Sequence, residues 1–165
     1  MKMGLTLDAK IKEIEAQFRA GDPGALPQAS KLIEKYPNEM GAWMLRAYIH
    51  GIQRNYNKAI DDLTHAIDIS PTEPCLFFDR GRYYLRSSDY QNAIDDFTNG
   101  LAACDLHSSD YYRETLHFFR ADMYLKLGNK KAACEDLKNV QDGFDIWTDR
   151  FCSKQELLAQ CTTDE

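Results

Sequence analysis

The chain has 165 residues, a length that fits one domain or one short array of repeats. Hydrophobic residues make up 44% of the chain, which is enough for a sizeable core and too many for a disordered protein. There are 26 acidic and 20 basic residues, so the net charge is -6. This acidic balance argues against binding to nucleic acid and against attachment to an anionic membrane, because both need a basic surface.

The sequence shows neither a targeting signal nor a disulfide framework. Charged residues from Asp8 to Glu13 interrupt every apolar run near the N-terminus, so no secretory signal is visible. No run approaches the roughly 18–20 apolar residues of a membrane span. The five cysteines lie at scattered spacings without a CxxC pair, which predicts reduced thiols that serve in packing. We therefore expect a cytoplasmic protein without a cofactor.

The first predicted structure along the chain is a pair of helices over residues 5–37. Apolar residues recur at helical spacing in its first half, at Leu7, Ile11, Ile14 and Phe18. The segment GDPG at residues 21–24 breaks this pattern, and a second helix follows up to Pro37. The pair is more polar than the segments after it. We expect a degenerate repeat that caps an array, since a terminal repeat has one face with no neighbour.

Three further segments repeat one another, at residues 40–71, 74–105 and 109–142. The first two superpose at a period of 34 without a gap, so that Trp43 falls on Phe77 and Ala47 on Gly81. The third copy is displaced by 40 residues, with Ala121 in the place of the small residue. Small residues at this position let two antiparallel helices approach closely, while the large residues fill the space around them.

The order of residues within each copy resembles the tetratricopeptide repeat (TPR) motif. A large aromatic residue is followed by a small one, then by Tyr, Ala, a bulky residue and Ala, with a closing proline at Pro71 in the first copy. Asp105 and Asp145 stand where the motif has proline in the other two copies. The resemblance covers about 100 of the 165 residues. It implies an all-α fold, a TPR-type solenoid of antiparallel helix pairs with capping helices at both ends, as one domain over residues 1–165.

Charged residues also recur in register with the repeat. Arg46, Arg80 and Arg120 directly precede the small residue of each copy, and Asp62, Asp96 and Asp136 share one place in each second helix. A basic row that binds an acidic ligand is one interpretation. We favour an Arg–Asp pair inside each repeat, with bidentate geometry, because the acid recurs in step with the arginine.

The last segment, residues 144–162, is predicted to be a closing helix over the final repeat. Ser153 and Glu156 have the spacing of a capping box at its start. Before them lies a dense apolar cluster that consists of Phe144, Ile146, Trp147 and Phe151. We expect this cluster to seal the end of the core. The alternative is a partner-binding surface, including a homodimer contact.

The resemblance to TPR proteins also implies where a ligand binds, because in that family the first helices of successive repeats line a concave groove. A mixture of aromatic and charged side chains in such a groove suits an extended or helical peptide. The positions carried over are Met44, Tyr48, Phe78, Asp79, Arg82, Arg86, Phe118, Phe119 and Asp122.

Nothing in the sequence points to catalysis or to a metal site. The four histidines are far apart, and although Cys104 and His107 have a C-x-x-H spacing, no second pair completes a four-ligand zinc site. There is no phosphate-binding loop and no nucleophile elbow. The Asp61-Asp62 and Asp95-Asp96 pairs point to different faces of a helix, which makes them poor two-carboxylate sites.

We therefore expect a protein-binding module rather than an enzyme. Its partner is a protein or a peptide, bound through the groove. The alternative is a protein dedicated to one partner, such as a bacterial secretion chaperone or a toxin-immunity protein, whose acidic surface would suit a basic toxin.

Overall fold

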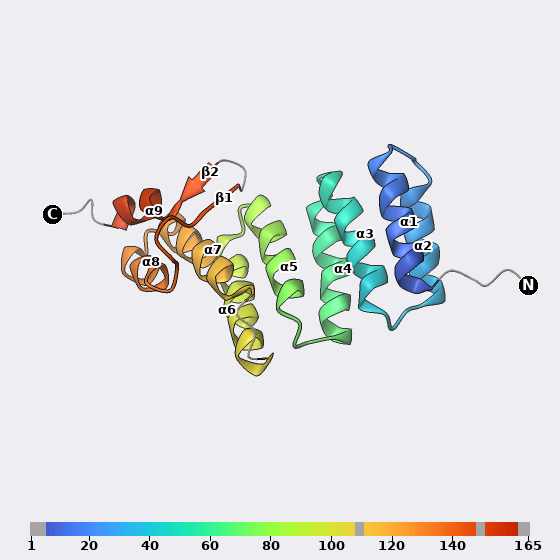
Figure 1. The fold of residues 1–165 in the computed structure, drawn as a ribbon. Helices are drawn as coiled ribbons and strands as arrows, with labels where there is room; N and C mark the ends of the chain where they lie inside the picture. Colours follow the sequence, from blue (N-terminus) through green and yellow to red (C-terminus); the bar gives the residue numbers. More distant parts are fainter. Residues whose placement is uncertain (1–5, 108–110, 148–150, 162–165) are drawn as a thin grey trace, which may run out of the picture. The chain divides into compact units, whose positions relative to one another are not determined.

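The computed structural model describes residues 6–107, 111–147 and 151–161, which divide into two compact units, Met1–Pro71 and Thr72–Glu165 (Figure 1). The all-α prediction is confirmed, with one small hairpin in addition. Unit 1 holds α1 (Leu7–Arg19), α2 (Ala25–Lys35), α3 (Met40–Ile52) and α4 (Tyr56–Ile69). Unit 2 holds α5 (Pro74–Arg86), α6 (Tyr90–His107), α7 (Arg113–Lys126), α8 (Lys130–Leu137), β1 (Asp145–Trp147), β2 (Phe151–Ser153) and α9 (Lys154–Cys161).

Unit 1 is held together by small residues at helix crossings and by larger residues between them. Ala25, Ala29 and Ala42 are wholly buried, so α2 and α3 pack closely. Helix α1 contacts both α2 and α3. At the second contact a Cβ atom on Gly41 would lie 3.1 Å from Ile11 Cδ1, which is a tight fit. The N-terminal pair therefore packs as part of the unit and is not a separate appendage.

Unit 2 has a core built around large apolar side chains from α6 and α7. Phe97 and Phe118 are the largest side chains that are fully buried there. A Cβ atom on Gly81 would lie only 2.5 Å from Phe97 Cε1. The second repeat therefore has glycine where the other two have alanine, because a phenylalanine occupies the space that a methyl group would need.

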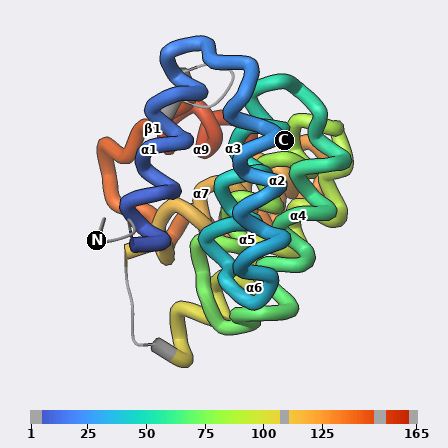
Figure 2. The backbone as a smooth tube through the Cα atoms, turned by 90° about the vertical axis from the view of Figure 1, so that its right-hand side faces the viewer, coloured from blue at the N-terminus to red at the C-terminus, as the bar shows by residue number. Residues whose placement is uncertain are grey.

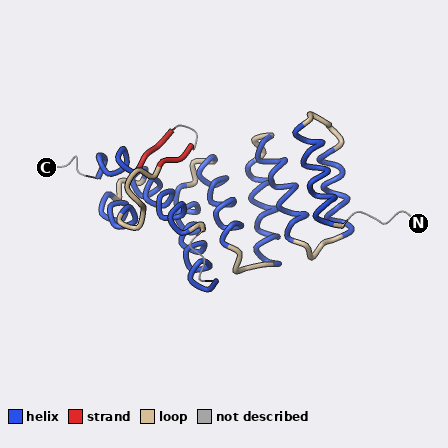
Figure 3. The backbone as a smooth tube through the Cα atoms, in the orientation of Figure 1, coloured by secondary structure: helices blue, strands red, loops and turns tan. Residues whose placement is uncertain are grey.

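The two helices of each described pair are joined by the same kind of turn. Figure 3 shows the loops that separate the helices. Gly21, Arg54, Ser88 and Gly128 have positive φ values of 84°, 61°, 60° and 77°. In each turn the next residue's N–H donates to a carbonyl five positions back, as from Asp89 to Tyr84 at 2.9 Å. This is the Schellman closure of a helix, which favours glycine at the left-handed position. The N-terminal pair shares the turn, as a degenerate repeat would.

The segment expected to be one closing helix contains a hairpin before the helix. β1 and β2 pair antiparallel with Ile146 opposite Cys152, and α9 begins only at Lys154. Cys152 is buried and Ile146 packs against the core, so the hairpin uses alternate residues to cover unit 2. The predicted capping box is confirmed: Ser153 N–H donates to Glu156 at 3.1 Å, and Glu156 N–H donates to Ser153 Oγ at 3.2 Å.

Candidate binding site

The predicted Arg–Asp pairs are present in all three repeats. Arg46 donates two hydrogen bonds to Asp62, at 2.9 and 2.6 Å. Equivalent bidentate bonds join Arg80 to Asp96 and Arg120 to Asp136, at 2.7 to 2.9 Å. All three aspartates are buried, so the arginines neutralise carboxylates inside the fold. This geometry supports the pairing interpretation and not a basic row open to a ligand.

Arg46 and Arg120 use their third nitrogen to reach the preceding helix pair. Arg46 Nη1 donates to Ser30 Oγ at 3.3 Å, and Arg120 Nη1 donates to Thr98 Oγ1 at 2.9 Å. The hydrogen bonds to Asp62 and Asp136 raise the pKa of Arg46 and Arg120 above the ordinary arginine value, although burial opposes this. These arginines are therefore structural ties between helices.

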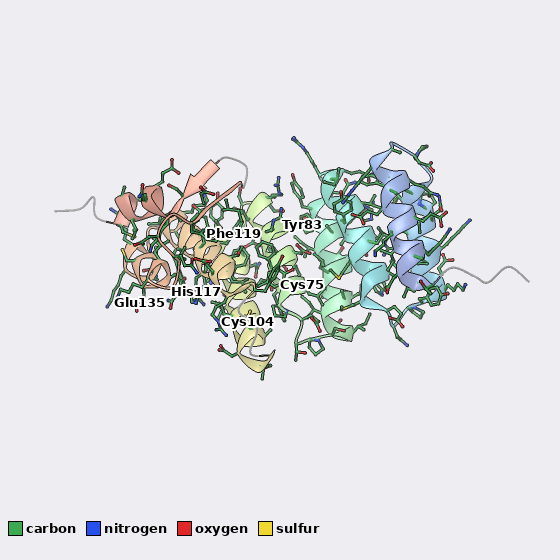
Figure 4. All side chains as sticks on the ribbon, in the orientation of Figure 1. Cys75, Tyr83, Cys104, His117, Phe119 and Glu135 are labelled. Atoms are coloured by element: carbon green, nitrogen blue, oxygen red, sulfur yellow. The ribbon has the colours of Figure 1, made fainter. Side chains whose placement is uncertain are left out.

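Several of the predicted groove residues meet in unit 2, where α5 lies against the start of α7. Four side chains form what we call the Phe78 site: Phe78, Asp79, Arg82 and Tyr112. The ring of Phe78 lies 5.6 Å from that of Tyr112 and 5.4 Å from the buried ring of Phe119. The Arg82 guanidinium lies 5.4 Å from the Phe78 centroid, and one nitrogen lies 3.7 Å from Asp79 Oδ1. Figure 4 labels Phe119 on α7 and, on α5, Cys75 one turn before Asp79.

The Phe78 site is unfavourable for additional negative charge. Burial raises the pKa of Asp79, and the nearby charge of Arg82 opposes this only in part. Burial, together with the charges of Asp79 and Glu73, raises the pKa of Cys75 to about 11. Burial and the charges of Cys75 and Asp79 also raise the pKa of Tyr112. A ligand that donates hydrogen bonds to Asp79 would stabilise its charged carboxylate, whereas a carboxylate of the ligand would add a second unfavourable negative charge beside it.

The predicted groove residues do not all lie at a surface. Phe118 and Phe119 are 1% and 3% exposed, so both belong to the core and not to a binding surface. Phe119 packs on Phe97, and Phe118 packs on Phe144 from the segment before the hairpin, at ring distances of 5.7 and 5.1 Å. Phe118 is therefore covered by the segment before the hairpin, and Phe119 by α6.

The other predicted positions are distributed over both units. Asp122 lies 3.7 Å from Lys126 Nζ, and Arg86 is exposed at the end of α5. Met44 and Tyr48 are half-buried on α3 in unit 1, where Tyr48 packs edge-on against Phe18 at 5.9 Å. Three of the predicted groove residues lie close to one another, because Arg82 contacts both the ring of Phe78 and the carboxylate of Asp79.

Sequence reasoning missed Tyr112, which the repeat alignment assigns to the insertion before α7. The signal was two adjacent tyrosines in an otherwise polar connection. Tyr111 is 82% exposed and lies edge-on to Tyr112 at 4.9 Å. An exposed aromatic residue beside the Phe78 site extends the apolar area open to a partner.

The described histidine side chains lie on different helices. His50 is buried on α3, and its Nδ1 has no hydrogen-bond partner in the part of the chain that the structure describes, whereas His65 lies against Trp43 with ring centroids 4.4 Å apart. His117 Nδ1 lies 2.9 Å from Asp136 Oδ1. The side chain of His107 lies outside what the structure describes, as do those of Trp147 and Phe151. Among the described residues, no three His, Cys, Asp or Glu side chains are grouped as metal ligands.

The predicted apolar cluster before α9 is described for two of its members. Phe144 and Ile146 are partly buried against the core of unit 2, which agrees with a sealing role. The homodimer alternative stays a prediction. None of the described helices has the length and apolar content that crossing a membrane requires.

Comparisons with known proteins agree with this architecture. The family model described as tetratricopeptide repeat matches residues 41–73, which span α3 and α4. Protein SGT1 homolog of Bos taurus is 28% identical over 80 residues, 48% of this chain and 24% of that protein. Tetratricopeptide repeat protein 16 of Homo sapiens is 28% identical over 88 residues, 53% of this chain and 10% of that protein. The chain thus spans a quarter or less of these curated relatives.

Solved structures show the same fold at low sequence identity. MamA from Desulfovibrio magneticus RS-1 has a TM-score of 0.67 at 15% identity, over 97% of this chain and 78% of that chain. A thermophilic TPR protein of Thermus thermophilus has a TM-score of 0.63 at 18% identity, over 81% and 71% of the two chains. The chain therefore has the fold of tetratricopeptide-repeat proteins, and its residues 41–73 match the tetratricopeptide repeat model.

Proposed function

We propose that the chain is a non-enzymatic protein-interaction module that binds a peptide or a protein segment at the Phe78 site. The observation that carries the proposal is the partly open ring of Phe78, which lies between Tyr112 and Arg82 and next to Asp79. An aromatic surface fixes an apolar side chain of the partner, and the charged groups fix its orientation. The TPR fold supports a role in binding proteins in general.

The chemistry of the site favours particular ligands. Because Asp79 is a carboxylate whose pKa burial raises, it gains from a hydrogen-bond donor of the partner. We expect bound segments to carry an aromatic or aliphatic side chain next to a donor such as Lys, Arg, Asn or Gln. Met44 and Tyr48 in unit 1 remain predicted contacts of the same partner.

The test is a selection from a random peptide display library on the whole chain, followed by binding titrations with the enriched peptides. Phe78→Ala should weaken binding roughly tenfold or more, because burial of such a ring is worth about 1.5–3 kcal/mol. Asp79→Asn should weaken the binding of peptides that carry a basic residue more than the binding of peptides whose donor is Asn or Gln. Asn99→Ala, at an exposed position on α6, is the control and should bind like the wild type.

Circular dichroism must show that each variant keeps its helical content. Enriched peptides that bind Phe78→Ala and Asp79→Asn as tightly as the wild type would show that the Phe78 site is not the ligand site. If the chain serves one dedicated partner, a single motif should dominate the selection.

A further inference from the structure

A second groove lies in unit 1, between α1 and α2. Its volume is about 460 Å³, within the range of sites that hold a ligand. Leu7, Ile14 and Leu32 form its apolar floor, and Lys10, Lys31 and Lys35 stand around them. Helices α3 and α4 contribute nothing to its lining. Figure 2 shows unit 1 with α1 and α2 toward the viewer.

The charge of this groove is opposite to that of the chain. The chain has a net charge of -6, but the lining of the groove includes three lysines and no acidic residue. Glu13 neutralises Lys10 at 2.9 Å. Lys31 and Lys35 are exposed and make no ion pair with any described residue. Lys35 Nζ lies 5.0 Å from the centroid of the Tyr36 ring, which does not neutralise its charge. Lys31 and Lys35 thus carry two positive charges without an acidic partner among the described residues.

The positions of Lys31 and Lys35 indicate the form of the ligand. Lys31 and Lys35 are four residues apart on α2, so their side chains leave one face of the helix about 5–6 Å apart. Two carboxylates one turn apart on a partner helix would match them. The apolar floor is recessed, since Ile14 is 0% and Leu32 6% exposed, so an apolar side chain must enter from the ligand.

We propose that the α1–α2 groove binds an acidic amphipathic segment of a partner protein. An apolar side chain of the segment rests over Ile14 and Leu32, and its carboxylates lie at Lys31 and Lys35. A flat anionic membrane fits less well, because the apolar area lies at the bottom of the groove and cannot enter a bilayer. The site is separate from the Phe78 site and does not depend on it.

The test uses a second display selection on the whole chain, with counter-selection against the double variant Lys31→Glu, Lys35→Glu. Peptides that bind the wild type and not this variant should be rich in Asp and Glu around apolar residues. Their binding, measured by fluorescence anisotropy, should weaken about tenfold or more in the variant and should fall as salt rises. Lys12→Glu, Lys58→Glu makes the same change of charge in unit 1 outside the groove, and it should retain binding.

Three results would overturn the proposal. The first is that counter-selection leaves no acidic peptides. The second is that the control variant loses as much binding as the groove variant does. The loss would then come from the net charge of the protein and not from the groove. The third is that vesicles of phosphatidylserine bind the wild type and compete with the selected peptides, which would make the surface a lipid site. Because Phe78→Ala leaves this groove intact, peptides that need Lys31 and Lys35 should still bind it.

Discussion

Among single residues, Asp136 shows most clearly how the fold holds a buried charge. Burial alone would raise its pKa, but hydrogen bonds from Arg120 and His117 outweigh burial and hold the pKa below the ordinary value. Arg120 donates at 2.7 and 2.8 Å, and His117 Nδ1 lies at 2.9 Å. In the third repeat, His117 is thus a second partner of the buried carboxylate, and the recurring arginines and aspartates of the sequence do not predict this contact.

The contribution of His117 can be measured from the pH dependence of stability. A carboxyl with a lowered folded pKa adds stability above its unfolded pKa, and this stability is lost as the pH falls through the folded pKa. His117→Leu removes one hydrogen bond, so the folded pKa of Asp136 should rise and the acid loss should begin at higher pH. We expect about 1–2 kcal/mol less stability near neutral pH, measured by urea unfolding. Carbon NMR of the Asp136 carboxyl should show the raised pKa, and an unchanged titration would contradict this account.

At the scale of elements, the left-handed turn between paired helices has two positions that glycine would suit better. Arg54 and Ser88 have φ values near 60°, and an L residue there costs about 1 kcal/mol. Ser88→Gly should therefore stabilise the protein by roughly 0.5–1 kcal/mol in urea unfolding, despite the flexibility that glycine gives the unfolded chain. Ser87→Gly is the control: its φ is -89°, so the change should bring no gain. A loss of stability in Ser88→Gly would contradict the strain argument.

The crossing of α5 and α6 is the most tightly constrained contact of the second repeat. Gly81→Ala would place a methyl group 2.5 Å from Phe97 Cε1, and Phe97 is fully buried, so a shift of its ring would disturb the packing around it. We expect a loss of about 1–3 kcal/mol in the free energy of unfolding. Adding Phe97→Leu to Gly81→Ala should recover part of the loss, because the smaller side chain leaves space for the methyl group. If the two changes are simply additive, the clash is not the cause.

The paired helices could be predicted because the residues that form their contacts recur at a regular interval in the sequence. Small residues recur at the crossings, and each arginine recurs with its aspartate. The hairpin could not be predicted, since strands of three residues are too short to show an alternating pattern and an apolar run around Ile146 also suits a helix. The burial of Phe118 depends on Phe144, 26 residues later in the sequence, and no local pattern reveals such a contact. For the same reason the candidate site was predicted only for its α5 residues.

At the scale of the whole molecule, the main helix contacts within each described unit join elements that are neighbours or next neighbours along the chain. Helix α1 contacts α2 and α3, and α9 contacts α8, α7 and β2. The terminal helices each bury a single residue fully, Ile14 in α1 and Leu157 in α9. Such an arrangement opens from its ends, as in other repeat proteins.

We therefore expect hydrogen exchange to be graded along the chain. Amides of α1 and α9 should exchange first, and those of α3, α6 and α7 last, because local opening of a terminal helix breaks fewer buried contacts. Mass spectrometry of peptides after exchange in native buffer would measure this order. Protection of α9 equal to that of α7 would show that the closing helix opens only with the unit as a whole.

The hydroxyl groups that accept from Arg46 and Arg120 have a consequence for how such a chain can lengthen in evolution. Ser30 and Thr98 belong to the helix pair before the arginine that they bind, and Thr64 stands at the same interval of 34 residues in the sequence. A tandem gene duplication of one 34-residue block therefore copies the arginine, its aspartate and the hydroxyl that the next arginine will need. A duplicated block would therefore carry both an Arg–Asp pair and a hydroxyl at the place where Ser30 and Thr98 accept from the arginine that follows them.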